Sequence, residues 1–182
     1  KRSLKYALEL IQDVMSLYGL QPLEKPKYRD YHLAYKSPEE LLRKNPPLVK
    51  YIQKAAETSE TLKEIAVSDT EKVNPFENLL NYSFQARLIQ ASKELQGFYG
   101  EIKNYCLSFY KVKSNISWSH ETFRIGRMTF LQIKAREKCL NLYLSLDPNG
   151  YDKNKYHFKD LKKPGKERSL PMLLKVRSKR SV

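Results

Sequence analysis

The sequence predicts an α+β domain, in which an antiparallel sheet of about five strands is covered by helices at residues 4–18 and 92–109. Two observations predict the helices and the sheet. Apolar residues recur at steps of three and four within both helical ranges, which is the spacing of one helix face. From residue 112 to 176 the chain changes to short runs separated by turn-like breaks. In the run Leu140–Leu146, leucines alternate with less apolar residues, so one face of that strand needs a cover.

The first helix has the clearest pattern. Its apolar stripe consists of Leu4, Ala7, Leu8, Ile11, Val14, Met15 and Tyr18. Ser3 is a suitable N-cap, and Gly19 is suitable for ending the helix. We expect this stripe to lie on the sheet made by residues 110–176, because an apolar helix face is stable only when it is buried.

The middle of the chain predicts a helical extension at residues 37–67. An aromatic run, Tyr31–Tyr35, precedes it and could be extended. Ser37-Pro38-Glu39-Glu40 has the form of a capping box with proline at the first helical position. The polar residues that follow predict a linker at 68–80, so the chain divides into a helical segment 1–67, this linker, and a sheet domain 81–182.

Residues 83–89 predict a strand or extended entry, followed by the helix 92–109 with Ser92 as its N-cap. The Asp147–Gly150 segment is the strongest turn signal. The predicted strands and extended segments are Val112–Trp118, Thr122–Ile125, Met128–Lys134, Leu140–Leu146, Tyr156–Lys159 and Met172–Val176.

The charge of the chain favours polyanionic partners. Its 182 residues include 34 Lys and Arg against 20 Asp and Glu, for a formal net charge of +14. Such a field attracts nucleic acid, anionic membrane or acidic polymers without selecting among them. A lysine-rich solubilising surface explains the same charge, and both interpretations stay open.

The two cysteines and the lengths of the apolar runs indicate the class of protein. Cys106 and Cys139 have no CxxC spacing and lie in apolar segments, so we expect small buried side chains in preference to a disulfide. No apolar run has the length of a membrane span, and no signal peptide is recognisable. A cytoplasmic location is the default expectation.

The two ends of the chain resemble each other. Lys1-Arg2-Ser3-Leu4 returns almost unchanged as Lys179-Arg180-Ser181-Val182. We therefore expect a window on a tandem repeat, circularly permuted so that the first helix covers the sheet of the following residues. Exchange of this helix between two chains, in a domain-swapped homodimer, would bury the same surfaces.

Several segments resemble a known family. They are Ile116–Trp118, Phe123–Arg127, Leu140–Pro148, Lys175–Ser178 and Ser3–Ile11. Together they resemble a bacterial domain of unknown function that occurs in tandem copies, and the resemblance covers residues 1–50 and 81–182. More distantly, the chain is similar to a domain labelled "predicted transport protein" and to the YjbR-like double-wing family, for which DNA binding has been suggested. The resemblance brings no catalytic residues, and its order of elements agrees with a permutation.

The sequence favours no catalytic site, metal or cofactor. His32, His120 and His157 fall in separate segments without HxxxH or HExxH spacing. The nearest approach to a catalytic cluster is His120-Glu121 beside Trp118, and a loop or strand end explains it more simply. We expect a protein that is not an enzyme.

The leading functional prediction is a non-catalytic module that binds nucleic acid or another polyanion through a basic sheet face. The residues assigned to it are Lys111, Lys113, Trp118, Arg124, Arg127, Lys134 and Arg136. Alternation places Arg124 opposite Phe123 and Ile125, an arrangement that suits phosphate contacts beside an aromatic platform. A solvated face whose charges discourage edge pairing fits equally well. A structural repeat that contacts protein partners is the alternative function.

Overall fold

The computed structural model describes residues 2–29, 83–136, 138–161 and 170–177, together with positions 40, 43 and 50. These residues form an α+β fold with one antiparallel sheet in the order β1-β2-β3-β4-β6-β5. The strands are β1 (Val112–Ile116), β2 (Glu121–Ile125), β3 (Met128–Arg136), β4 (Cys139–Leu144), β5 (Lys159–Asp160) and β6 (Met172–Arg177). The sheet therefore has six strands where about five were expected, and the additional one is the two-residue β5.

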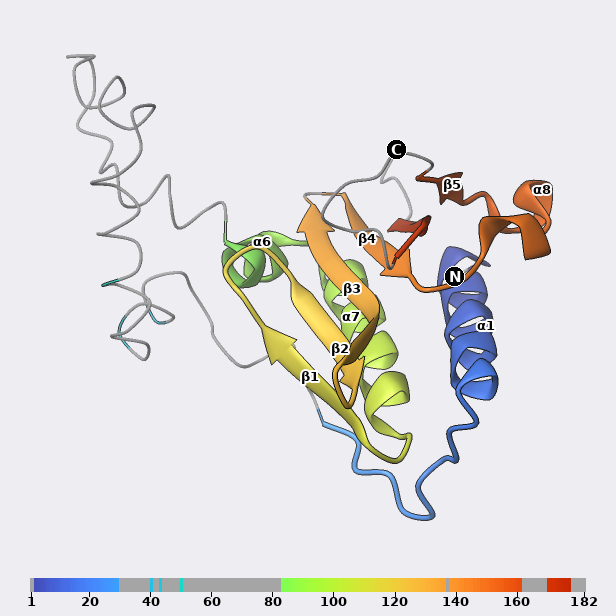
Figure 1. The fold of residues 1–182 in the computed structure, drawn as a ribbon. Coiled ribbons are helices and arrows are strands. Elements are labelled where there is room, and N and C mark those ends of the chain that lie inside the picture. Colours follow the sequence, from blue (N-terminus) through green and yellow to red (C-terminus); the bar gives the residue numbers. More distant parts are fainter. Residues whose placement is uncertain are drawn as a thin grey trace.

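Two long helices cover one face of this sheet, as predicted. They are α1 (Arg2–Leu17), which packs on β6 and β4, and α7 (Lys93–Leu107), which packs on β1 and β4. Figure 1 shows α7 crossing behind the strands, with α1 beside it and running in the same direction. The apolar stripe of α1 is buried against the strands of its own chain, with Ile11 and Val14 fully inaccessible to solvent.

The ends of α1 differ in how well they match the sequence prediction. The helix begins at Arg2, so the expected N-cap role of Ser3 is wrong. Ser3 lies in the first turn, where its Oγ accepts a hydrogen bond from the Arg177 amide at 3.4 Å. This contact ties the start of α1 to the end of β6. At the other end, Gly19 has φ +61°, the left-handed conformation that commonly terminates a helix.

The predicted extended segment at 83–89 is wrong, because these residues form helix α6 (Phe84–Gln90). Ser83 caps it by accepting a hydrogen bond from the Ala86 amide at 3.1 Å. The side chain of Gln96 donates to the carbonyls of Leu88, Ile89 and Ala91, which satisfies acceptors that a helix end leaves open. Long-range contacts of this kind are invisible to a local pattern. The predicted cap of α7 is confirmed, since Ser92 accepts from the Leu95 amide at 3.3 Å.

The segment between β4 and β6 contains the predicted turn and departs from expectation after it. The turn at 147–150 is a short 3-10 helix, η1 (Pro148–Gly150), whose cap is the Asp147 side chain. The predicted extended run Tyr156–Lys159 is largely wrong, because Tyr156 ends helix α8 (Lys153–Tyr156). His157 then adopts a left-handed φ of 53°, and only from Lys159 does the chain pair with β6.

Several predictions fall outside the described residues. They concern the aromatic run at 31–35, the linker at 68–80, and the helical extension at 37–67 apart from Glu40, Arg43 and Lys50, which are helical. Within the described part of the chain, no helix is both long and apolar enough to cross a membrane.

The burial of α1 leads to a direct test of the fold. Ile11 is 0% exposed, whereas Leu17 on the same helix is 66% exposed. We expect Ile11→Ala to lower the free energy of unfolding by about 2–5 kcal/mol, because it leaves a cavity under the helix. Leu17→Ala is the matched control and should change stability by less than about 0.5 kcal/mol. Urea denaturation followed by circular dichroism measures both, and equal effects of the two substitutions would contradict the packing.

Candidate nucleic-acid interface

The pleat of the sheet separates its side chains into two faces. Phe123, Ile133 and Leu142 point toward the helices and are 0% exposed. Their neighbours along each strand point to the opposite, outer face, and residues paired across strands share a face. All charged residues at outer positions of the described strands are basic: Lys113, Arg124, Lys134, Arg136, Lys159, Lys175 and Arg177. The outer face of the described sheet thus carries no carboxylate.

Four of these basic residues lie at two levels along the strands, and Arg136 and Arg177 lie beyond the second level, both opposite Cys139. At one level Lys113 and Arg124 are direct cross-strand partners on β1 and β2. Like charges placed opposite one another destabilise a sheet, so this pair costs folding energy. At the other level Lys134 and Lys175 both flank Asn141, on β3 and β6. Lys113 and Arg124 thus lie on adjacent strands, whereas β4 lies between the strands of Lys134 and Lys175.

A neutral row lies between the two basic levels. It runs across β1, β2, β3, β4 and β6 as Asn115, Thr122, Gln132, Tyr143 and Leu173, and it ends at Lys159 on β5. Thr122, Gln132 and Leu173 of this row are buried. Tyr143 is partly exposed, and the amine of Lys134 lies 4.8 Å from the centre of its ring, within the range of a cation–π contact. The outer face thus combines a central aromatic ring with cations on both sides.

The structure brings together most of the residues assigned from sequence. Lys113, Arg124, Lys134 and Arg136 share the outer face. Two others border it at the end where β1 meets the β2–β3 turn. Arg127 is exposed in this turn, beside Gly126, which has φ +61°.

The second residue at this border is Lys111, which directly precedes β1. Its φ is 65°, and its amine lies 5.4 Å from the centre of the Tyr110 ring. Both border residues remain close enough to the face to add to its field.

Trp118 does not belong to this face. It follows β1 in a loop, is half-buried, and accepts a hydrogen bond from the Phe84 amide through its carbonyl at 2.7 Å. Among the described strands, the aromatic residue at an outer position is Tyr143 on β4. Trp118 is the last residue of the predicted strand Val112–Trp118, but β1 ends at Ile116, so strand alternation does not extend to it.

Sequence reasoning missed the contribution of the last strands. Lys175 and Arg177 alternate with Leu174 and Val176, and this alternation was a signal that could have assigned them to the outer face. Their proximity to Lys134 could not be found in the same way, because β4 and β6 pair across a long connection.

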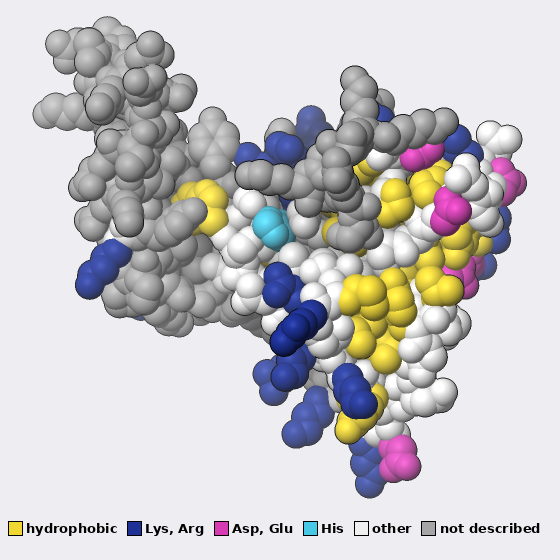
Figure 2. Space-filling view, in the orientation of Figure 1, with side chains coloured by type: hydrophobic (Ala, Val, Ile, Leu, Met, Phe, Trp, Pro, Cys, Tyr) yellow, Lys and Arg dark blue, Asp and Glu magenta, His cyan; other side chains and the backbone are white. Residues whose placement is uncertain are grey.

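Figure 2 shows Lys and Arg gathered over the part of the face formed by β1–β3, whereas the Asp and Glu visible in this view lie near α8 and at the lower tip.

The catalytic-looking pair His120-Glu121 separates in the structure. Nδ1 of His120 lies 2.8 Å from Ser119 Oγ, whereas the carboxylate of Glu121 points inward and is 0% exposed. Glu121 begins β2, and the alternation of that strand directs its side chain toward α7.

Glu121 belongs to a buried polar cluster with Tyr99 and Lys103. Tyr99 donates its hydroxyl proton to Glu121 Oε2 at 2.7 Å, and the amine of Lys103 lies 2.7 Å from Oε1. That amine also donates to the Tyr99 hydroxyl at 3.2 Å. Among the described residues Oε1 accepts no well-angled hydrogen bond, so the charge of Lys103 compensates it. The cluster fixes α7 against β2 from inside the core.

Cys106 lies one turn beyond Lys103 on α7, and its thiol is buried near the same Glu121 carboxylate. Burial raises the pKa of its thiol well above the ordinary value of 9.0, and the Glu121 carboxylate raises it further. A thiol held in its neutral form is a poor nucleophile. Cys106 and Cys139 are both free thiols, buried and partly buried respectively.

No family model, curated protein or solved structure matches this chain. Within the described ranges, no group of three His, Cys, Asp or Glu residues is placed to hold a metal ion. The chemistry of the outer face is therefore assigned from its geometry.

The buried cluster leads to a second test. Lys103→Met leaves the Glu121 carboxylate buried without its counter-charge, and we expect a loss of about 3 kcal/mol in unfolding free energy. Glu121→Leu should cost a similar amount, because it removes the counter-charge of the buried Lys103 ammonium. The double variant should recover most of the loss, since apolar groups can replace a buried ion pair at little cost. Additive losses in urea denaturation would show that the two charges do not compensate each other.

Proposed function

We propose that the outer sheet face binds single-stranded nucleic acid. The observation that carries this proposal is the charge of the face, on which every charged outer residue of the described strands is Lys or Arg. Lysine and arginine supply the phosphate contacts that dominate affinity for nucleic acid.

The spacing of the two basic levels supports the same ligand. Arg124 and Lys134 are each two residues away from the neutral row along their strands. Two strand residues span about 7 Å, so the levels are about 13 Å apart. The backbone of a nucleic acid can contact cations at either level while its bases lie over the row between them.

The neutral row contains groups that suit unpaired bases. Tyr143 provides a ring for stacking, and such a contact tolerates any base because each has a π-face. A single strand exposes the faces of its bases to stacking, whereas a duplex buries them.

The charge prediction is tested by Arg124→Gln and Lys175→Gln, which remove one cation from each level. We expect the double variant to bind a fluorescein-labelled oligo(dT) or oligo(U) at least tenfold more weakly in fluorescence anisotropy. If each residue contacts one phosphate, the slope of log K against log[salt] should fall in magnitude by about 0.7 per residue removed. Lys25→Gln is the matched control, because Lys25 is exposed and lies outside the sheet.

Tyr143→Leu separates stacking from charge. It should weaken binding of the single strand by about tenfold, within the range of one stacked base, and leave the salt slope unchanged. Absence of oligonucleotide binding by the parent protein at low salt would overturn the proposal, as would an equal loss with Lys25→Gln. Tighter binding of duplex than of single strand would overturn the assignment of a single strand.

A further inference from the structure

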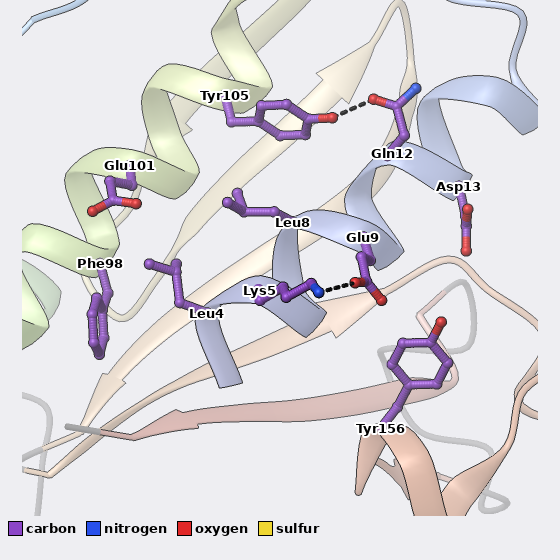
Figure 3. Close-up of a pocket in the computed structure, with 10 residues that line it drawn as sticks. All are labelled: Leu4, Lys5, Leu8, Glu9, Gln12, Asp13, Phe98, Glu101, Tyr105 and Tyr156. Carbon is purple, nitrogen blue, oxygen red and sulfur yellow. Dashed lines mark hydrogen bonds and ion pairs between the residues drawn. The ribbon is translucent and has the colours of Figure 1, made fainter. Parts of the chain in front are cut away.

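A groove lies on the helical side of the molecule, between α1 and α7 and opposite the basic face (Figure 3). Its volume is about 820 Å³, within the range of clefts that bind ligands. It is lined by Leu4, Lys5, Leu8, Glu9, Gln12, Asp13, Phe98, Glu101, Tyr105 and Tyr156. The two helices contribute nearly all of these residues, so the groove runs along α1 and α7.

The lining repeats with the period of a helix. On α1, Leu4, Leu8 and Gln12 form an inner row at steps of four, and Figure 3 shows both leucines turned toward α7. Phe98 of α7 lines the groove beside this row, and Tyr105 of α7 donates its hydroxyl proton to Gln12 at the far end. A row from residue 4 to 12 is about 12 Å long, which matches two to three turns of a third helix packed along it.

The rims of the groove are acidic, in contrast to the chain as a whole. Glu9 and Asp13 stand on the α1 side, and Glu101 stands on the α7 side. Glu9 already has two lysine neighbours, at 3.8 Å and 3.7 Å from its carboxylate oxygens. No described residue forms an ion pair with Glu101. The rims therefore present carboxylates on both sides of a floor formed by the half-buried Leu8 and by the edges of Leu4 and Phe98, which are 7% and 6% exposed.

One of these lysines shows how an ammonium is held at this rim. Lys155 of α8 lies 3.7 Å from Glu9 and 4.4 Å from the centre of the Tyr156 ring. Its amine also donates to the Tyr156 hydroxyl at 2.8 Å. A carboxylate beside an aromatic ring is a favourable site for a cation. Tyr105 stands near Glu101 on α7, one turn away, and offers a similar combination.

We infer that this groove docks an amphipathic helix of a partner protein, whose apolar stripe lies on Leu4, Leu8 and Phe98 and whose flanking lysines or arginines reach Asp13 and Glu101. Docking of a helix in an apolar groove is a common mode of recognition, with anchors at i, i+3, i+4 and i+7. Charge complementarity selects a basic helix over an acidic one. The acidic rims also repel phosphate, so this surface and the basic face attract different ligands.

The probe for this inference is a synthetic, fluorescein-labelled peptide that forms an amphipathic helix with leucines on one face and lysines on the other. We expect it to bind the intact protein at low salt in fluorescence anisotropy. A peptide with the same leucine face and glutamates in place of lysines should bind at least tenfold more weakly. A scrambled lysine peptide, which keeps the composition and loses the stripe, should also bind at least tenfold more weakly.

Variants of the protein locate the binding. Glu101→Lys reverses a charge at an exposed position and should weaken binding of the lysine peptide at least tenfold, and Asp13→Asn should weaken it severalfold. Glu24→Gln is the control, because Glu24 is exposed and does not line the groove. Oligonucleotide binding by Glu101→Lys should not fall, so failure of one site is distinguishable from failure of the other.

Three results would overturn the inference. They are absence of binding by the lysine peptide, equal binding of the scrambled peptide, and equal weakening by Glu24→Gln.

Discussion

The burial of one sheet face under α1 and α7 is the constraint on which the rest of the structure depends. Strand alternation sends Phe123, Ile133 and Leu142 to the inner face, where they are 0% exposed. The same alternation necessarily sends their neighbours outward. A register shift of one residue would bury the basic side chains and expose the core. The location of the basic face is thus a consequence of the packing that stabilises the fold.

The two sides of the molecule differ in chemistry as a result. The strand side presents Lys and Arg around Tyr143, and the helical side presents carboxylates around an apolar groove. With both proposed ligands, this separation would let one domain hold two partners without competition between them. The opposed pair Lys113 and Arg124 is unfavourable for a sheet, and an anionic ligand would relieve its repulsion.

Much of the fold could be predicted from the sequence, because the information is local. The stripe of α1, the Ser92 cap and the alternation in β4 each depend on a few neighbouring residues. The incorrect predictions concern segments whose structure depends on contacts with residues far away in the sequence. The side chain of Gln96 donates a hydrogen bond to the Ile89 carbonyl at the end of α6. The Arg177 amide donates a hydrogen bond to Ser3 Oγ, 174 residues away in the sequence. Neither contact leaves a periodic signal.

The candidate site was predictable to the same extent. Strand alternation alone places Arg124 and Lys134 outward, so their shared face follows once β2 and β3 pair as a hairpin. The addition of Lys175 required the position of β6 next to β4. The inward turn of Glu121, and its pairing with Lys103, depended on how α7 docks. The packing of segments distant in the sequence therefore determines which charged residues lie on the outer face and which are buried in the core.

Photo-crosslinking with a 4-thiouridine-substituted oligonucleotide tests the central claim most directly, because it reports which side of the sheet meets the nucleic acid. We expect crosslinks in peptides of β3 and β4, including the one that contains Tyr143, on the face opposite the helices. Crosslinks confined to α1 or α7 would contradict it, because those helices lie on the other side of the sheet (Figure 1).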